Sequence, residues 1–140
     1  MSAKPKGLID TGAILALVDQ SDRWHRRCVQ AFSTLRLPLA TSAAVLAELF
    51  HLLDTTREAA AAWGFLGSGA VTVLPIDDAD LPDLQALMQR YSDRPMDFAD
   101  ATLVHLAKRE GLVTVFTVDH DDFETYRIEG KRRFRIVPDR

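Results

Sequence analysis

Residues 96–107 constrain the fold most, because they predict a helix whose side chains are apolar on nearly every face. Two acids, Asp97 and Asp100, fall in the expected first turn, and Pro95 suits the first position of such a helix. Residues three apart share one helix face, so both carboxylates should lie at the rim of the core. Taken alone, acids at this position favour helix capping over a functional role. The other faces seek burial, which makes this helix central to the fold.

The rest of the chain alternates predicted strands with predicted helices. Strands are expected at 7–10, 37–40, 71–76, 112–118 and 133–137. Helices are expected at 13–18, 23–35, 43–53, 57–66 and 77–91, with a helical turn near 122–126. This alternation predicts the α/β class, as a three-layer α/β/α fold with a mainly parallel central sheet. A length of 140 residues, with 47% hydrophobic and 26% charged side chains, predicts one globular domain spanning residues 1–140.

Further acids fall where this topology would bring them to the same place. Asp10 follows the first predicted strand, and Asp119 follows the β-branched strand 112–118. Carboxyl ends of parallel strands and amino ends of helices meet at one edge of such a sheet, where ligands bind. Asp97 and Asp100 open a helix at that edge, and Glu48 lies within two turns of its own helix start. We therefore expect five carboxylates to converge.

Converging carboxylates predict a cation site, because ionised acids in contact repel one another unless some are protonated or a cation neutralises them. Ligation by oxygen alone favours Mg²⁺ or Mn²⁺. Such ions activate water and stabilise the charge that develops on a phosphodiester during hydrolysis. The sequence contains no glycine-rich phosphate loop, zinc-protease helix motif or serine nucleophile elbow. Hydrolysis of a nucleic-acid backbone is the reaction that this residue set favours.

Cysteine content, hydropathy and charge limit the setting in which the chain works. Cys28 is the single cysteine, which excludes an internal disulfide and suits a reducing compartment. No window approaches the roughly 20 apolar residues of a membrane span, so we expect a cytoplasmic protein without membrane association. The net charge of −3 does not exclude a nucleic-acid partner, because five acids that share one metal-filled pocket would leave the remaining surface positive.

Four acidic segments, in this order, resemble the motifs of the PIN-domain family, and more closely those of its bacterial VapC-like branch. The first segment is 8–17 followed by Asp22 and His25, and the second is 44–48. The third is 96–101, and the fourth is 117–119 with residues 122 and 123. Each motif alone is weak, but four in order at suitable spacing are fairly specific. The resemblance extends from about Leu8 to Val137.

The resemblance implies an endoribonuclease that depends on Mg²⁺ or Mn²⁺ and cuts RNA. It implies that Asp10, Glu48, Asp100 and Asp119 bind metal and position water, with Asp97 as an auxiliary acid. The hydroxyls of Thr11 and Thr117 would orient these carboxylates. Family members often act as toxins neutralised by a small antitoxin protein and often form homodimers, so both partners are implied here.

Two groups of basic residues are candidates for binding the RNA backbone. One lies on the predicted helix 23–35, and the other lies near the end of the chain. The candidates are Arg23, Arg26, Arg27, Lys131, Arg132, Arg133 and Arg135. Such clusters are also common on ordinary solvated surfaces.

Two alternatives remain at this point. A receiver-like phospho-acceptor module also gathers acids around Mg²⁺ at strand ends, but it needs a lysine at the end of a later strand, whereas Lys108 lies inside a predicted helix. The second alternative is a PIN relative that binds RNA or protein without catalysis. Retention of all four acids argues against this second alternative.

Overall fold

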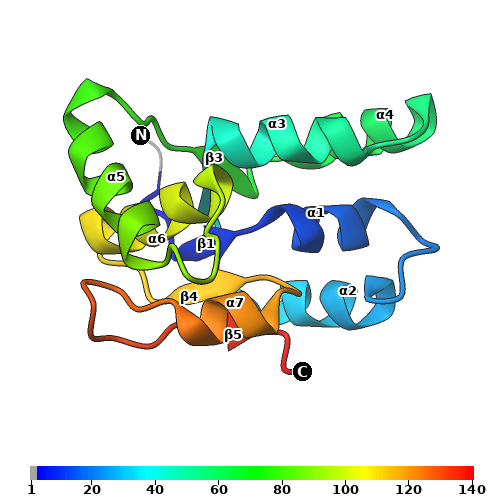
Figure 1. Ribbon diagram of the computed structural model, residues 1–140. Coiled ribbons are helices and arrows are strands. Elements are labelled where there is room, and N and C mark those ends of the chain that lie inside the picture. The colour runs from blue at the N-terminus through cyan, green and yellow to red at the C-terminus, as the bar shows by residue number, and fades with distance from the viewer. Residues whose placement is uncertain (1–2) are drawn as a thin grey trace.

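A parallel β-sheet forms the centre of the molecule, in a computed structural model that describes residues 3–140. Its strands, within these residues, are β1 (Gly7–Ile9), β2 (Leu39–Thr41), β3 (Val71–Val73), β4 (Thr114–Phe116) and β5 (Arg135–Val137). They lie in the order β3-β2-β1-β4-β5, and each pairs in parallel with its neighbours. Two parallel strands need a long crossover connection, which is usually a helix. In Figure 1 the colours, which run along the chain, show helices between successive strands. The sheet is therefore wholly parallel where a mainly parallel one was expected.

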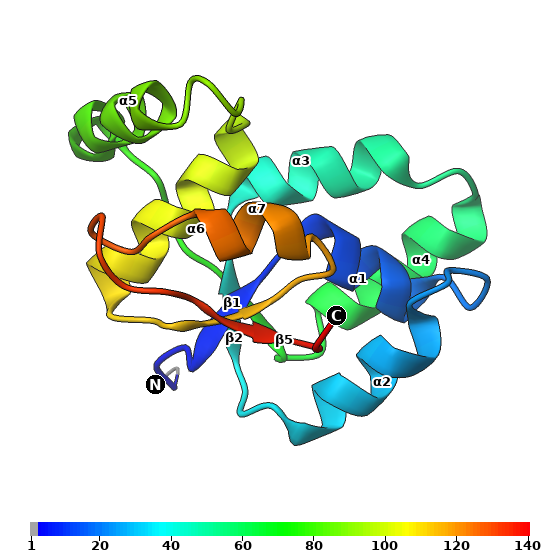
Figure 2. The same cartoon turned by 60° about the horizontal axis from the view of Figure 1, so that its bottom comes forward.

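Helices cover both faces of this sheet. They are α1 (Thr11–Val18), α2 (His25–Thr34), α3 (Ala43–Leu52), α4 (Thr56–Leu66), α5 (Leu81–Arg90), α6 (Phe98–Glu110) and α7 (His120–Thr125), with a 3₁₀ turn, η1 (Asp78–Asp80), before α5. Figure 2 shows α3, α5, α6 and α7 above the strands and α2 below them, with α1 and α4 to the right of the strands. Phe32 of α2 stacks on Phe116 of β4, with ring centroids 6.4 Å apart, which joins one helix layer to the sheet. The predicted three-layer α/β/α fold is confirmed.

The apolar helix that dominated the sequence is α6, and it is the most buried helix of the fold. Every residue from Ala99 to Ala107 is buried, against α5, α3 and β1. The helix begins at Phe98 and not at Pro95, because the side chain of Asp97 accepts a hydrogen bond from the Asp100 N–H at 2.8 Å and caps it. Gly111, with φ of 69°, ends the helix in the left-handed conformation.

Other element boundaries shift by a few residues. The strands are three residues long, shorter than expected, and the segment expected as one helix over 77–91 divides into η1 and α5. Asp77 caps η1, and Pro82 stands in the first turn of α5, where its missing N–H costs nothing. The helix after Asp22 starts later than expected, at His25, because the Asp22 carboxylate binds the N–H of Trp24 before the helix forms.

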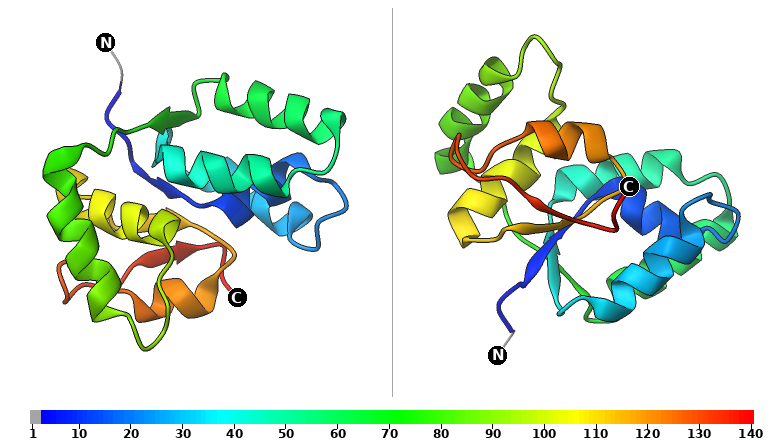
Figure 3. Two further views of the ribbon diagram at one scale, coloured as in Figure 1. Left: turned by 45° about the horizontal axis from the view of Figure 1, so that its top comes forward. Right: turned by 90° about the horizontal axis from the view of Figure 1, so that it is seen from below.

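The central strands β1 and β4 bring three helix starts to the same edge of the sheet. α1 begins directly after β1, α7 begins shortly after β4, and in Figure 3 the first turn of α6 faces the junction of β1 and α1. Gly12 permits the close approach, since a Cβ at this position would lie 2.7 Å from Cγ2 of Val118. No helix within residues 3–140 combines the length and apolar character that a membrane span needs.

Candidate active site

Asp10 is the most buried acid at this edge of the sheet. It caps α1, and its Oδ1 accepts a hydrogen bond from the Thr11 N–H at 2.8 Å. The hydroxyl of Thr117 donates to its Oδ2 at 3.0 Å. The pKa of Asp10 is nevertheless raised to about 7, mainly by burial and to a smaller extent by the negative charges of Glu48 and Asp119. Asp10 is therefore a buried carboxylate that accepts two hydrogen bonds and lies near other negatively charged side chains.

Asp100 lies in the first turn of α6 and is also buried. The phenol of Tyr126 donates to its Oδ2 at 2.8 Å. Burial raises the pKa of Asp100 to about 8, and the charges of Asp10 and Asp97 act in the same direction. The hydrogen bond from Tyr126 favours the ionised form but does not compensate for these effects.

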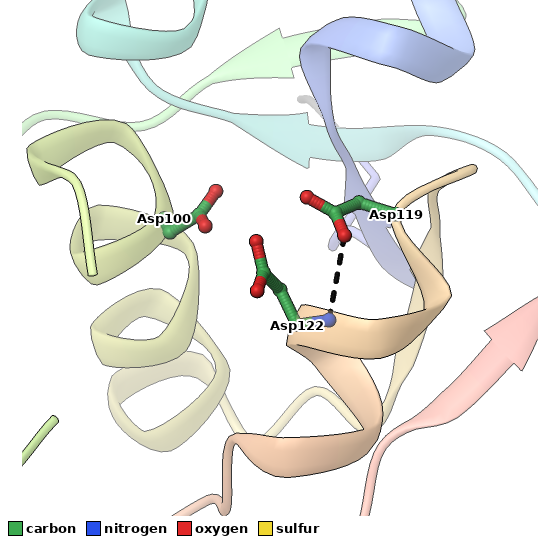
Figure 4. Close-up of side chains that lie close together, drawn as sticks. All are labelled: Asp100, Asp119 and Asp122. Atoms are coloured by element: carbon green, nitrogen blue, oxygen red, sulfur yellow. Dashed lines mark hydrogen bonds between the residues drawn. The ribbon is translucent and has the colours of Figure 1, made fainter. Parts of the chain in front are cut away.

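Asp119 and Asp122 complete a cluster of carboxylates with Asp100 (Figure 4). One carboxylate oxygen from each of the three lies within 4.8 Å of the others. Asp119 caps α7 by accepting a hydrogen bond from the Asp122 N–H at 3.3 Å, so the two acids share the first turn of one short helix. Burial, followed by the contact with the Asp122 carboxyl, raises the pKa of Asp119 to about 6. We call these three residues the acidic triad.

Glu48 and Asp97, the remaining predicted acids, do not belong to the triad. Glu48 is half-buried on α3, and its charge is felt at Asp10, where it raises the pKa of that carboxyl. Asp97 is exposed and caps α6, as its capping bond to the Asp100 N–H shows. Its negative charge raises the pKa of Asp100, so it influences the site without belonging to the triad.

The two threonines differ from the expectation that both hydroxyls orient acids. Thr117 contacts two of them: its hydroxyl donates to Asp10 and accepts a hydrogen bond from the Asp119 N–H at 3.0 Å. The hydroxyl of Thr11 instead donates to the carbonyl of Val45 at 3.3 Å. The expectation for the Thr11 hydroxyl was wrong, because its backbone N–H holds Asp10 while its side chain faces α3.

Three residues of this site were missed from the sequence, namely Asp122, Tyr126 and Arg94. Asp122 stood in the fourth acidic motif, three residues after Asp119, and that helical spacing was a usable signal. Tyr126 is one further turn along the same segment and resembles an ordinary core aromatic residue. Arg94 lies in the loop before α6, and its Nη2 is 2.9 Å from Oδ1 of Asp122. No local pattern in the sequence pairs Arg94 with an acid 28 positions away.

The basic candidates separate into two groups on different sides of the molecule. Arg23 and Arg27 flank Trp24, whose ring lies 5.4 Å from that of His120, the residue after Asp119. Lys131 and Arg132 line a pocket with Lys108 near the end of α6, away from its first turn. Residues 131–133 precede β5, which puts them at the amino edge of a parallel sheet, whereas the acids follow strands at the carboxyl edge. The structure therefore places Arg23 and Arg27 beside His120, which follows Asp119 in the chain, and residues 131–133 at the other edge of the sheet.

The residues at this edge fit a divalent cation. All available ligand atoms of the triad are carboxylate oxygens, which hard ions such as Mg²⁺ and Mn²⁺ prefer. Burial is the largest cause of the raised pKa values of Asp10, Asp100 and Asp119, and neighbouring acids add to it, so the ionised forms lack stabilisation. A cation would supply the missing positive charge.

Fold and site together define a class of protein: parallel α/β domains that gather carboxylates from distant segments at the carboxyl edge of the sheet. The strand order 3-2-1-4-5 also separates this fold from the receiver-like alternative, whose order is 2-1-3-4-5. The chain belongs to the PIN-domain family, whose model matches residues 7–129. The family resemblance noted in the sequence is thus confirmed.

Two proteins from Mycobacterium tuberculosis are similar to this chain, one in sequence and one in fold. The chain is 30% identical over 142 residues to a protein named ribonuclease VapC26, and the match covers 94% of this chain and 99% of that protein. The crystal structure of VapC20, described as a sarcin-ricin loop cleaving toxin, superposes with a TM-score of 0.73. That match covers 81% of this chain and 90% of the other, at 24% identity, and it supports the fold.

Proposed function

We propose that this protein is an endoribonuclease of the toxin type that depends on Mg²⁺ or Mn²⁺. The observation that carries the proposal is the acidic triad, with Asp10 buried next to it and pKa values of about 6 to 8 for Asp10, Asp100 and Asp119. The relationship to a protein named ribonuclease VapC26, over nearly the whole of both chains, supports RNA as the substrate.

In this proposal, Asp100, Asp119 and Asp122 hold the cation, and Asp10 and Glu48 add negative charge beside it. When bound, the cation activates water and stabilises the charge that develops on the phosphodiester. The protein's own contribution is to fix the carboxylates. Thr117 holds Asp10 and the backbone of Asp119, while Tyr126 holds Asp100. Sites prearranged in this way lose little energy to reorganisation when charge develops.

RNA would approach the exposed side of the triad, where Asp119 is accessible to solvent. Arg23, which precedes α2, and Arg26 and Arg27 on α2 are exposed, and in this proposal they are the basic residues that contact the backbone. Lys131, Arg132, Arg133 and Arg135 contribute less in this proposal, because residues 131–133 lie at the opposite edge of the sheet and Arg135 lies within β5.

We further propose that the protein acts in the cytoplasm, forms a homodimer and is neutralised by a small antitoxin protein. The relationship to VapC-named proteins supports the toxin assignment. Co-expression tests it: expression of the chain alone should arrest growth, and expression with the product of a small adjacent reading frame should relieve the arrest. Growth arrest by the Asp100→Asn protein as well would argue that the toxicity does not come from cleavage.

The activity is tested with a circular RNA, which has no ends for an exonuclease, incubated with the purified protein and Mg²⁺ or Mn²⁺. We expect linear products with the cation and none in excess chelator. Asp100→Asn should lower the cleavage rate at least about 100-fold, because it removes a ligand charge from the triad. Asp121→Asn is the matched control, since Asp121 lies on the same helix as Asp122 but pairs with Arg140. Binding of RNA without cleavage under all these conditions would favour a non-catalytic PIN relative.

A further inference from the structure

Arg94 forms an ion pair with Asp122, a member of the acidic triad. Its Nε and Nη2 donate to the same oxygen of Asp122, Oδ1, at 3.1 and 2.9 Å. Its third nitrogen, Nη1, donates to the hydroxyl of Thr125 at 3.0 Å. Arg94 belongs to the loop between α5 and α6, so the contact joins that loop to the start of α7.

The charge of Arg94 acts on the triad beyond its direct partner. It lowers the pKa of Asp119, against the effect of burial. The Arg94 side chain is 43% exposed, and that of Asp122 is 30% exposed, so the pair lies at the solvent side of the site. Arg94 is thus a positive charge at the rim of a cluster that otherwise has too much negative charge.

We propose that Arg94 is a built-in counterion that competes with the metal for Asp122 and, once the metal is bound, binds the phosphate of the substrate. The inference rests on the proposed function, because it assigns a substrate contact to that same site. A cation held by the triad takes over the neutralisation of Asp122, which frees the guanidinium. The planar fork of an arginine matches the oxygens of a phosphate.

The two proposed roles of Arg94, as a competitor of the metal and as a phosphate contact, predict opposite changes in metal affinity and RNA affinity when Arg94 is removed. Removal of Arg94 removes a competing positive charge, so the metal should bind more tightly. The same removal deletes a phosphate contact, so RNA should bind more weakly. A residue that merely keeps the site folded would weaken both, which makes the pair of signs diagnostic.

The experiment measures Mn²⁺ binding by calorimetry without RNA, and the KM for RNA cleavage at saturating Mn²⁺. For Arg94→Gln we expect Mn²⁺ affinity to rise about three- to fivefold, as for loss of a partly exposed charge pair. We expect KM to rise about tenfold, as for loss of a charged hydrogen bond. Arg94→Lys keeps the charge and should restore Mn²⁺ affinity to that of the unmodified protein, and KM in part.

Arg109→Gln is the matched control. Arg109 forms a similar ion pair, with Asp80 at 3.1 Å, but lies in the last turn of α6, whereas the acids lie at its first turn. Its loss removes one positive charge and its ion pairs with Asp80 and Glu110, and neither Mn²⁺ affinity nor KM should change.

Weaker Mn²⁺ binding by Arg94→Gln would overturn the proposal, because Arg94 would then support Asp122 as a ligand and not compete for it. An unchanged KM would overturn the phosphate contact. If the unmodified protein cuts no RNA, the proposed function fails, whereas the Mn²⁺ measurement still decides whether Arg94 competes with the metal.

Discussion

At the scale of single residues, the acids of the site are held by the hydroxyl groups of two other side chains. The hydroxyl of Thr117 contacts two acids, and the phenol of Tyr126 contacts Asp100, which is 26 positions away. The Thr117 hydroxyl is fully buried and links Asp10 to the backbone of Asp119. One small side chain therefore fixes the relative position of two acids that are 109 positions apart. Such supporting contacts typically change metal affinity or activity by about 10- to 100-fold when they are removed.

Thr117→Val tests this bridge. The valine keeps the volume but donates no hydrogen bond to Asp10 and accepts none from Asp119, so we expect cleavage to fall about 10- to 100-fold. Thr11→Val is the matched control, because the Thr11 hydroxyl contacts the Val45 carbonyl and no acid. Cleavage rates at saturating metal measure the effect, and thermal melts check the fold. Equal losses for the two variants would contradict the bridge.

At the scale of elements, α6 shows both the success and the limits of sequence reasoning. Its apolar surface indicated a central helix, and residues Ala99–Ala107 are all buried. Its start was predicted at Pro95 because proline suits a first turn, but the carboxylate of Asp97 competes successfully for the cap position. Residue preferences indicate which residues are acceptable at a helix start. In α6, the capping hydrogen bond of Asp97 determines which residue is the first of the helix.

The role of Asp97 follows from this cap. Asp97→Asn keeps a capping oxygen and removes the charge, so we expect stability to change little and cleavage to stay near that of the unmodified protein. Asp97→Ala removes the cap and should lower the free energy of unfolding by about 1 kcal/mol. Chemical denaturation measures the stability of both variants, and cleavage assays with Mn²⁺ titration measure the activity and metal binding of Asp97→Asn. Loss of Mn²⁺ binding in Asp97→Asn would show instead that this acid is a ligand.

At the scale of the whole molecule, topology explains why the acids could be predicted and why their partners could not. Asp10 and Asp119 follow strands, and the carboxyl ends of parallel strands share an edge, so their convergence followed from alternation of strands and helices alone. The contacts of Tyr126 with Asp100 and of Arg94 with Asp122 span 26 and 28 positions between elements whose relative orientation only tertiary packing fixes. Short-range patterns contain no such information.

For the whole molecule, the buried acids of the site also determine how the stability of the metal-free protein depends on pH. Asp10, Asp100 and Asp119 have folded pKa values of about 7, 8 and 6, above the value of 3.8 expected when unfolded. The folded state then binds more protons than the unfolded state, so its stability falls as pH rises from about 4 toward 8. We expect Mn²⁺ to bind the ionised acids and therefore to raise the melting temperature more at pH 8 than at pH 5.5.

Melting curves at both pH values, with chelator or with Mn²⁺, test this prediction. Asp100→Asn should reduce the pH dependence in chelator and the stabilisation by Mn²⁺, because it removes the acid with the highest of these pKa values. A metal-free protein that becomes more stable between pH 5.5 and 8 would contradict the assigned direction of the pKa shifts.

The placement of the triad along the chain has a consequence for biosynthesis. Its last two members are residues 119 and 122 of 140, and β4, just before them, pairs with β5 at 135–137. A ribosome must therefore have synthesised the chain as far as residue 122 before all three carboxylates exist. During earlier translation, the nascent polypeptide has no complete triad with which to capture a cation, which delays the proposed RNA cleavage until residues 119 and 122 have been added and have folded against Asp100.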